Sequence, residues 1–207
     1  SIKQLLEMKG KGYFSEADEN EAYELLAVQI KNTEIMLNEL LQWANRQMDG
    51  VKPNPTSVNL SHTVTEVLVG YSFQLRTKLL TPDHQIAKNV NIIIDKVQLK
   101  IIIQNLIGNA IKFTPENGQI KIYYETNDNH VIFHIEDSGV GIDSKYHEMI
   151  NGKDYTRIPS LRGTANEKGT GLGIFLVKQF VDLNGGKLKM ESKEGEGTHF
   201  ILYFLRA

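Results

Sequence analysis

The 207-residue sequence contains no cysteine. This absence excludes disulfide frameworks, zinc–cysteine sites and thiol catalysis. An excess of basic residues is also lacking, because 23 Lys and Arg face 25 Asp and Glu and the net charge is −2. The composition therefore gives no indication of nucleic-acid binding. No run approaches the roughly 18 apolar residues that a bilayer span requires, so we expect no direct membrane insertion.

The chain starts at Ser1 without the apolar region of a signal peptide. It also lacks an initial methionine, so we expect it to be part of a longer protein. What the chain does contain is apolar sequence, which makes up 41% of its residues. That is enough to bury the core of one domain with an appendage, or of two small domains.

The first segment is predicted to be a long helix. Apolar residues recur three, four and seven positions apart from Ala22 to Met48, a pattern typical of one helical stripe. A helix of roughly 28 residues would be about 42 Å long and would need partners along its length. Pro53 and Pro55 then force extended backbone. We therefore expect an appendage at 1–52 and a domain at 53–207, with a surface helix on one larger domain as the alternative.

The domain mixes helical and extended patterns. Helices are predicted at 60–80, 96–113 with Asp95 as its N-cap residue, and 170–184. Strands are predicted at 90–94, 119–126, 130–136, 187–192 and 199–205. The fold class is therefore α+β, and a sheet on one side with helices on the other is the expected two-layer arrangement.

One glycine cluster follows a predicted strand directly: Asp137-Ser138-Gly139-Val140-Gly141. A carboxylate at a strand end can accept a hydrogen bond from an exocyclic amine, and glycines let the backbone approach a flat base closely. A plain turn after a strand uses the same residue types. Alone, this cluster therefore leaves both interpretations open.

A second cluster, Gly169-Thr170-Gly171-Leu172-Gly173, opens a predicted helix. Free N–H groups and the positive end of the helix dipole at such a site attract phosphate. The cluster lacks the Gly-Lys-Ser/Thr ending of a P-loop, and no strand precedes it closely. A flexible loop that enters a helix remains the alternative.

Two asparagines, Asn105 and Asn109, lie four residues apart and share a face of the predicted helix at 96–113. Asparagine is unfavourable in a helix interior, and an amide oxygen is a suitable ligand for Mg²⁺. Lys112, one turn beyond Gly108, could reach a phosphate. The alternative is an amide network that is satisfied inside the core.

Taken together and in this order, the motifs resemble those of the superfamily of gyrase-type ATPases, mismatch-repair ATPases and histidine kinases. Leu106–Ala110 with Lys112-Phe113-Thr114 resembles the N box, and the two glycine clusters resemble the G1 and G2 boxes. Gly195-Glu196-Gly197-Thr198 resembles the closing glycine–threonine motif. The sequence Asn-Ala-Ile-Lys-Phe-Thr is similar to that of the N box of histidine kinases in particular. This resemblance implies a Bergerat-type fold, in which helices cover one face of a mixed sheet and a long helix precedes the domain.

The resemblance implies ATP and Mg²⁺ as cofactors. Asp137 would bind the adenine amino group and Gly141 would line the base. Asn109 would hold Mg²⁺, with Asn105 nearby, and Lys112 would contact phosphate. The complete set implied for ATP binding is Asn109, Lys112, Asp137, Gly139, Gly141, Lys168, Gly169, Thr170, Gly171, Leu172, Gly173 and Thr198.

The stretch 143–168 would be the mobile ATP lid, with glycines of the G2 box as its hinge. Arg157, Arg162 and Lys168 are candidates for contact with the outer phosphate, and the sequence does not choose among them. Histidine kinases usually carry a phenylalanine pair in this stretch. Here the apolar substitutes are Met149, Ile150 and Tyr155.

Position 105 separates two activities within the superfamily. Members that hydrolyse ATP carry a glutamate there, which activates water as a general base. Asn105 is a very poor base, so the γ-phosphoryl group is expected to go to a histidine of another element. The catalytic residues implied are Asn105, Asn109 and Lys112. A superfamily ATPase and a non-catalytic nucleotide-binding or interaction module are the alternatives.

None of the six histidines lies in the acceptor motif of the family, in which an acidic residue, then arginine and proline, follow the histidine. The helix at 22–48 instead resembles the second helix of the dimerisation bundle, so we expect the acceptor helix to precede Ser1. The resemblance further implies a homodimeric parent protein, a response-regulator receiver domain as partner and a cytoplasmic location. Whether the parent protein is a sensor in the inner membrane stays an open question.

Overall fold

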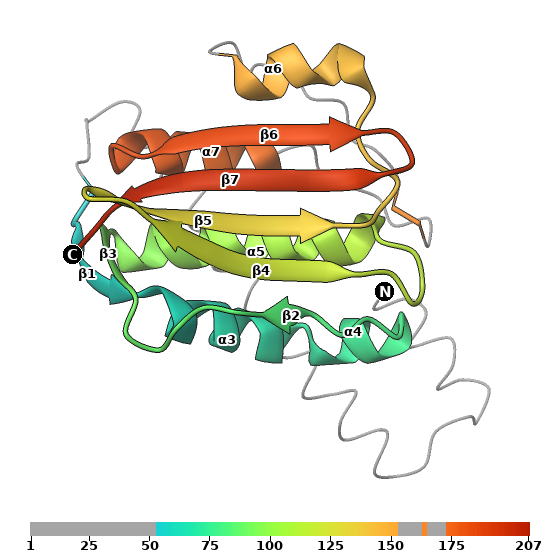
Figure 1. The fold of residues 1–207 in the computed structure, drawn as a ribbon, viewed down its shortest axis with the longest axis horizontal. Coiled ribbons are helices and arrows are strands. Elements are labelled where there is room, and N and C mark those ends of the chain that lie inside the picture. The colour runs from blue at the N-terminus through green and yellow to red at the C-terminus, as the bar shows by residue number, and fades with distance from the viewer. Residues whose placement is uncertain (1–52, 153–162, 165–172) are drawn as a thin grey trace, which may run out of the picture. The chain divides into compact units, whose positions relative to one another are not determined.

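The computed structural model describes residues 53–152, 163–164 and 173–207, which belong to the compact unit Lys52–Ala207 (Figure 1). The helix predicted at 22–48 lies outside the described residues. The assignment of 1–52 to a dimerisation appendage therefore stays a prediction. In the described part, no helix is both long enough and apolar enough to cross a membrane.

A five-stranded mixed sheet forms one layer of the domain. Its strands, in spatial order, are β2 (Asp83–His84), β4 (Ile120–Thr126), β5 (His130–Asp137), β7 (Gly197–Leu205) and β6 (Lys187–Lys193). Strand β2 runs parallel to β4, and all other neighbours are antiparallel. A separate antiparallel pair joins β1 (Thr56–Asn59) to β3 (Asn91–Ile94). All five predicted strands are confirmed, whereas β1 and β2, of four and two residues, were not predicted.

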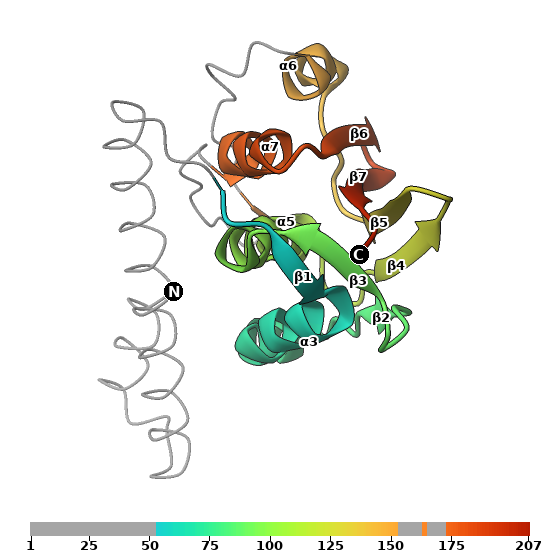
Figure 2. The same ribbon diagram turned by 90° about the vertical axis from the view of Figure 1, so that its left-hand side faces the viewer.

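Three helices lie on the same side of the sheet, as Figure 2 shows: α3 (Leu60–Gly70), α5 (Lys96–Phe113) and α7 (Gly173–Leu183). Two short elements, η1 (Ser144–Tyr146) and α6 (His147–Asn151), follow β5. The predicted two-layer α+β arrangement is confirmed. Asp95 caps α5 as predicted, because its Oδ1 accepts the N–H groups of Val97 and Gln98 at 3.0 and 3.1 Å.

The helix predicted at 60–80 is in fact two helices, α3 and α4 (Ser72–Thr77), separated at Tyr71. Gly70, which has a low helix propensity, ends α3. The backbone of Tyr71 has φ −101° and ψ 8°, outside the regular helical region. The hydroxyl of Tyr71, at the break, donates to the carbonyl of Gln104 in α5 at 3.2 Å.

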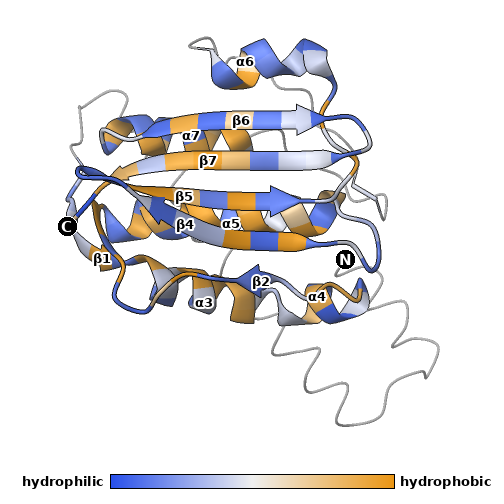
Figure 3. Ribbon diagram, in the orientation of Figure 1, coloured by the Kyte–Doolittle hydropathy of each residue, from blue (hydrophilic) through white to orange (hydrophobic). Residues whose placement is uncertain are grey.

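The core lies between the sheet and the helices. Along the strands, hydrophobic residues alternate with hydrophilic ones (Figure 3), as expected when one face of a sheet is buried. Phe133 and Ile135 of β5 are buried, and so are Ile102 and Leu106 of α5. This packing holds α5 across the sheet and fixes the position of its asparagine face.

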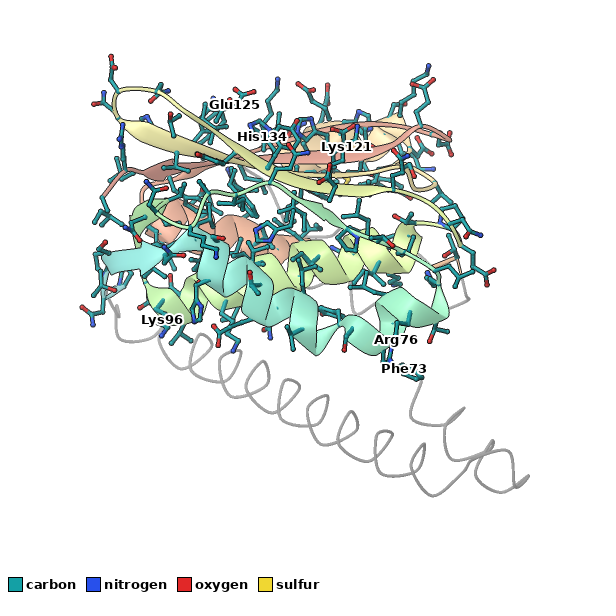
Figure 4. The ribbon with its side chains drawn as sticks, turned by 60° about the horizontal axis from the view of Figure 1, so that its bottom comes forward. Phe73, Arg76, Lys96, Lys121, Glu125 and His134 are labelled. Carbon is teal, nitrogen blue, oxygen red and sulfur yellow. The ribbon has the colours of Figure 1, made fainter. Side chains whose placement is uncertain are left out.

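The opposite face of the sheet carries a cluster of rings. Figure 4 shows His134, Lys121 and Glu125 on the side away from the helices. His134 stacks on Tyr123 at 4.5 Å between ring centroids, and its Nδ1 lies 3.0 Å from Nε2 of His199. Burial lowers the pKa of both histidines, and for His134 the neighbouring His199 lowers the pKa further. Glu125 and Glu136 oppose these shifts for both rings, with Glu191 also raising and Lys189 lowering the pKa of His199.

Acidification is expected to destabilise the domain through this histidine pair. Because both pKa values are lowered on folding, the unfolded chain binds protons more readily, and the free energy of unfolding falls as the pH drops through about 6.5. The urea midpoint of wild type should therefore fall more between pH 8 and pH 5.5 than that of His199→Gln. His62→Gln, at an exposed histidine, is the control. An equal fall in wild type and His199→Gln would contradict this prediction.

Candidate nucleotide site

Asp137 is the last residue of β5, and its side chain is buried beneath the turn of the G1 box. The residue is only 7% exposed, and its Oδ1 accepts the N–H of Gly139 at 2.9 Å. Burial raises the pKa of Asp137 to about 6, although backbone hydrogen bonds from Gly139 and Thr198 act in the opposite direction. A strongly shifted carboxyl group among glycine motifs is typical of a functional site.

The turn of the G1 box is fixed by bonds to two other elements. The N–H of Val140 donates to the carbonyl of Phe113, at the end of α5, at 3.2 Å. The carbonyl of Val140 accepts the N–H of Gly195, in the turn between β6 and β7, at 2.9 Å. Gly141 has φ +71°, and a Cβ there would collide with the carbonyl of Lys193. Glycine is therefore required at this position.

Thr198 lies directly opposite Asp137 in the register of β5 and β7, and it is buried. Its Oγ1 is 3.0 Å from Oγ of Ser192, which also accepts the N–H of Ile142 at 2.9 Å. Ser192 thus links the closing motif to the turn of the G1 box. No sequence motif pointed to Ser192, although it occupies an inward-facing position of β6.

The asparagine face of α5 forms the other side of the candidate site. Asn105 and Asn109 are both half-buried. Nδ2 of Asn105 donates to the carbonyl of Ile101 at 2.9 Å. Gly173, the last residue of the G2 box, lies so close that a Cβ there would be 2.7 Å from Oδ1 of Asn105. The end of the G2 box therefore lies beside the helix that carries the N box.

Lys112 lies one turn beyond Asn109 on α5, and its Nζ is 4.7 Å from the centroid of the Phe113 ring. The lysine is half-buried at the end of the helix. The predicted phosphate contact of Lys112 stays a prediction.

Several predicted residues lie outside the described part of the chain: Lys168, Gly169, Thr170, Gly171, Leu172, Arg157, Arg162 and Tyr155. Two of the apolar substitutes for the phenylalanine pair are described. Ile150 is buried in α6, and Met149 is half-buried beside it. The next residue, Asn151, exchanges two hydrogen bonds with the backbone of Met190, at 2.8 and 2.9 Å, and so attaches α6 to the edge strand β6.

The donor set limits how a metal could be held. Among the described residues, no group of three or more His, Cys, Asp or Glu side chains is placed to bind a metal ion. The amide of Asn109 is the metal ligand that the sequence predicts. Such a site suits Mg²⁺, which keeps several waters and takes its remaining ligands from substrate phosphates.

The chain resembles proteins of known class. Residues 94–207 match the family described as histidine kinase-, DNA gyrase B- and HSP90-like ATPase. The sequence is 27% identical over 192 residues to the sensor protein SrrB of Staphylococcus aureus (strain MRSA252), a match that covers 92% of this chain and 33% of SrrB. The chain thus spans about a third of the length of the curated relatives it matches.

Solved structures show the same fold. The catalytic domain of histidine kinase ThkA is 28% identical, with a TM-score of 0.62 over 74% of this chain and 96% of that domain. ThkA in complex with the response regulator TrrA has a TM-score of 0.64 at 22% identity, over 100% of this chain and 57% of ThkA. Full-length ShkA in complex with AMPPNP has a TM-score of 0.67 at 21% identity, over 94% of this chain and 40% of ShkA.

Asp137 is expected to reduce the stability of the domain at neutral pH. Its pKa is raised from 3.8 to about 6 on folding, so the contribution of Asp137 to the free energy of unfolding falls as the pH rises from about 4 to 6. Asp137→Asn keeps an oxygen for the N–H of Gly139 and removes the charge, and it should raise this free energy by roughly 1–3 kcal/mol at pH 7.

Urea denaturation at pH 7 and at pH 4 measures this effect. The gain should be present at pH 7 and absent at pH 4, where the carboxyl group is already protonated. Asp128→Asn, at an exposed position in the hairpin between β4 and β5, is the matched control. A destabilising effect of Asp137→Asn at pH 7 would contradict the interpretation.

Proposed function

We propose that this chain, which belongs to the histidine kinase-, DNA gyrase B- and HSP90-like ATPase family, acts in a sensor histidine kinase and transfers the γ-phosphoryl group of ATP to a histidine. The described residues form the ATP-binding catalytic domain of histidine-kinase type. One observation carries the proposal above all others. It is the buried carboxyl group of Asp137, held at a strand end beside the N-box helix.

Recognition of adenine rests on Asp137. Its carboxylate would accept a hydrogen bond from the exocyclic amine, while Gly139 and Gly141 let the base approach the backbone. This hydrogen bond would favour the ionised carboxylate and so relieve part of its desolvation. A guanine base, which presents a carbonyl oxygen at the corresponding position, would meet repulsion.

Phosphate binding rests on α5 and the G2 box. Asn109 would hold Mg²⁺, which when bound neutralises the charge of the triphosphate. Lys112 and the residues of the G2 box would contact the phosphates. The similar fold of ShkA in complex with AMPPNP supports an ATP-type ligand.

Asn105 favours transfer to histidine over hydrolysis. Its amide is a very poor base, and its Nδ2 already donates to the carbonyl of Ile101. Asn105 would therefore not activate a water molecule for hydrolysis of ATP. An imidazole nitrogen of a separate helix would instead attack the γ-phosphorus, the bond to the bridging oxygen would break, and ADP would leave. This feature argues against the superfamily ATPase that the sequence left open.

The partners of the whole protein follow from the same assignment. The ThkA complex contains a response regulator, and a receiver domain of this class would take the phosphoryl group onward. The acceptor histidine would lie on a dimerisation helix of a homodimeric parent protein. The domain would act in the cytoplasm, where ATP is available.

ATP titration by calorimetry tests nucleotide binding. Wild type should bind ATP more tightly with Mg²⁺ than without it. Asp137→Asn should lose at least tenfold in affinity under both conditions, because the amide presents a donor where the adenine amine needs an acceptor. Asn109→Ala should lose the strengthening by Mg²⁺, and Asp128→Asn should match wild type. A well-folded wild type that binds no ATP would leave the non-catalytic interaction module as the better assignment.

A second arm tests the transfer itself. The chain is incubated with γ-labelled ATP and a separate acceptor fragment, a histidine-kinase dimerisation hairpin that carries its phospho-accepting histidine. Acid-labile label should appear on that histidine with wild type and should be lost with Asp137→Asn. Rapid release of free phosphate without label on the fragment would instead favour an ATPase.

A further inference from the structure

The α5–β4 connection, which runs from Phe113 to Gln119, lies against the G1 box. At its start, the carbonyl of Phe113 accepts the N–H of Val140 at 3.2 Å. At its end, Gln119 exchanges two hydrogen bonds with Ser138. The N–H of Gln119 donates to Oγ of Ser138 at 2.8 Å, and the carbonyl of Gln119 accepts the N–H of Ser138 at 3.0 Å. The turn that follows Asp137 is therefore bound at both ends of the connection.

The two backbones also approach each other closely. A Cβ at Gly139 would lie 2.6 Å from the carbonyl oxygen of Phe113 and 2.6 Å from Oδ1 of Asp137. A Cβ at Gly118, within the connection, would lie 3.1 Å from Oγ of Ser138. The α5–β4 connection and the G1 box are therefore in direct contact, and a displacement of one would disturb the other.

Lys78 holds the connection from its other side. This residue is the C-cap of α4 and is 8% exposed. Its Nζ donates to the carbonyls of Ile111 at 2.8 Å, Lys112 at 2.9 Å and Thr114 at 3.3 Å, and to Oγ1 of Thr164 at 2.7 Å. The last carbonyls of a helix have no partner within the helix, and an ammonium group there also interacts favourably with the helix dipole. Lys78 therefore stabilises the end of α5.

Pro115 explains why this end of the helix needs an outside donor. A helical carbonyl accepts from the N–H four residues further on, and for Ile111 that residue is Pro115, which has no N–H. Lys78 supplies the missing donor, and its own carbonyl accepts the N–H of Asn117 at 3.1 Å. Asn117 has φ +60°, in the left-handed region. Lys78 thus binds both the helical start of the connection and its turn.

We propose that Lys78 is a positioning residue for adenine recognition, because it holds the α5–β4 connection in the conformation on which the turn of the G1 box rests. This inference rests on the proposed function, in which Asp137 receives the base. Without the ammonium group, buried carbonyls at the end of α5 would lack a donor, and the connection would move to satisfy them. The turn of the G1 box would move with it, and Asp137 would lose the fixed surroundings that precise binding of a base requires.

Lys78→Met tests this role, because it removes the ammonium group and keeps most of the side-chain stem. Affinity for ADP, measured by calorimetry, should fall roughly threefold or more. Affinity for Mg-ATP should fall by the same factor, since both ligands carry the same base. Val131→Ala is the control for lost stability, because it removes buried methyl groups at the end of β5 opposite Asp137. It should lower the urea midpoint, as Lys78→Met does, and leave both affinities near those of wild type.

The pKa of Asp137 separates positioning from general destabilisation. Burial is the largest cause of its raised pKa, so a looser turn that admits water should lower it from about 6 in Lys78→Met. Direct loss of a positive charge would instead raise the pKa of a carboxyl group. A fall therefore reports a change in the surroundings of Asp137. Carbon NMR of the carboxyl group measures this pKa, which should stay unchanged in Val131→Ala.

Ser138→Ala provides a second variant that tests the other side of the connection. Ser138 is exposed, and its backbone bond to Gln119 stays in place, so the fold should be retained. The substitution removes the oxygen that accepts the N–H of Gln119. Affinity for ADP and the pKa of Asp137 should both fall, in the same direction as in Lys78→Met.

Several results would overturn the inference. A folded Lys78→Met that binds ADP as wild type does, or in which the pKa of Asp137 does not fall, would do so. A loss for Mg-ATP without a loss for ADP, or equal losses in Val131→Ala, would also do so. If Lys78→Met does not fold, wild-type affinity and pKa in Ser138→Ala would be decisive against it.

The same measurements separate the inference from the proposed function. If Asp137→Asn abolishes binding while Lys78→Met retains the affinity of wild type, only the inference fails. A well-folded wild type that binds neither ADP nor Mg-ATP overturns the proposed function and the inference with it.

Discussion

Removing an ionised carboxyl group from water costs free energy. The candidate nucleotide site is organised around one such buried group. Asp137 is buried where β5 ends, and burial raises its pKa despite two backbone N–H groups directed at it. Those donors exist because the G1 box turns sharply after the strand and because β7 runs beside it. Gly197, with φ +104°, lies so close that a Cβ would collide with the carbonyl of Asp137. A residue larger than glycine at position 197 would therefore disturb the backbone around Asp137.

Helix α5 relates this carboxyl group to the rest of the site. Its N-terminus is fixed by Asp95, its buried face by the core and its C-terminal carbonyls by hydrogen bonds from the G1 box, Lys78 and Thr164. The asparagine face of α5 is thus held in place from both ends of the helix. A nucleotide that meets Asp137 with its base and Asn109 with its phosphates would meet groups whose positions are set before it arrives, which lowers the cost of binding.

The periodic pattern of apolar residues predicted the helices and strands that are long enough to have such a pattern. Helix α5 and its cap, the hairpin of β4 and β5, and the strands β6 and β7 were all predicted close to their observed bounds. The break at Tyr71 was not predicted, because the apolar stripe continues across Gly70 while the backbone does not remain helical. Strand β2, with two residues, is too short to show a pattern, and in the sheet it pairs with β4.

Some residues of the site could likewise be predicted from the sequence, and others could not. Asp137, Asn109 and the glycine boxes were recognisable because their order and residue types resemble a known family. Ser192, Lys78 and Thr164 carry no such signal, because their roles depend on contacts between segments that lie far apart in the sequence. The one local sign was that Lys78 falls three residues after the buried Leu75 in the helix predicted at 60–80. That spacing does not reveal which carbonyls the ammonium group will meet.

The proposed role of Asp137 in adenine recognition depends most directly on the protonation of its carboxyl group. Carbon NMR of its side-chain carboxyl group across a pH titration, with and without ADP, measures the pKa in both states. We expect a pKa of about 6 in the free protein and a lower pKa in the complex, because a hydrogen bond from the adenine amine favours the ionised form. A pKa near 4 that does not change when ADP is added would contradict it.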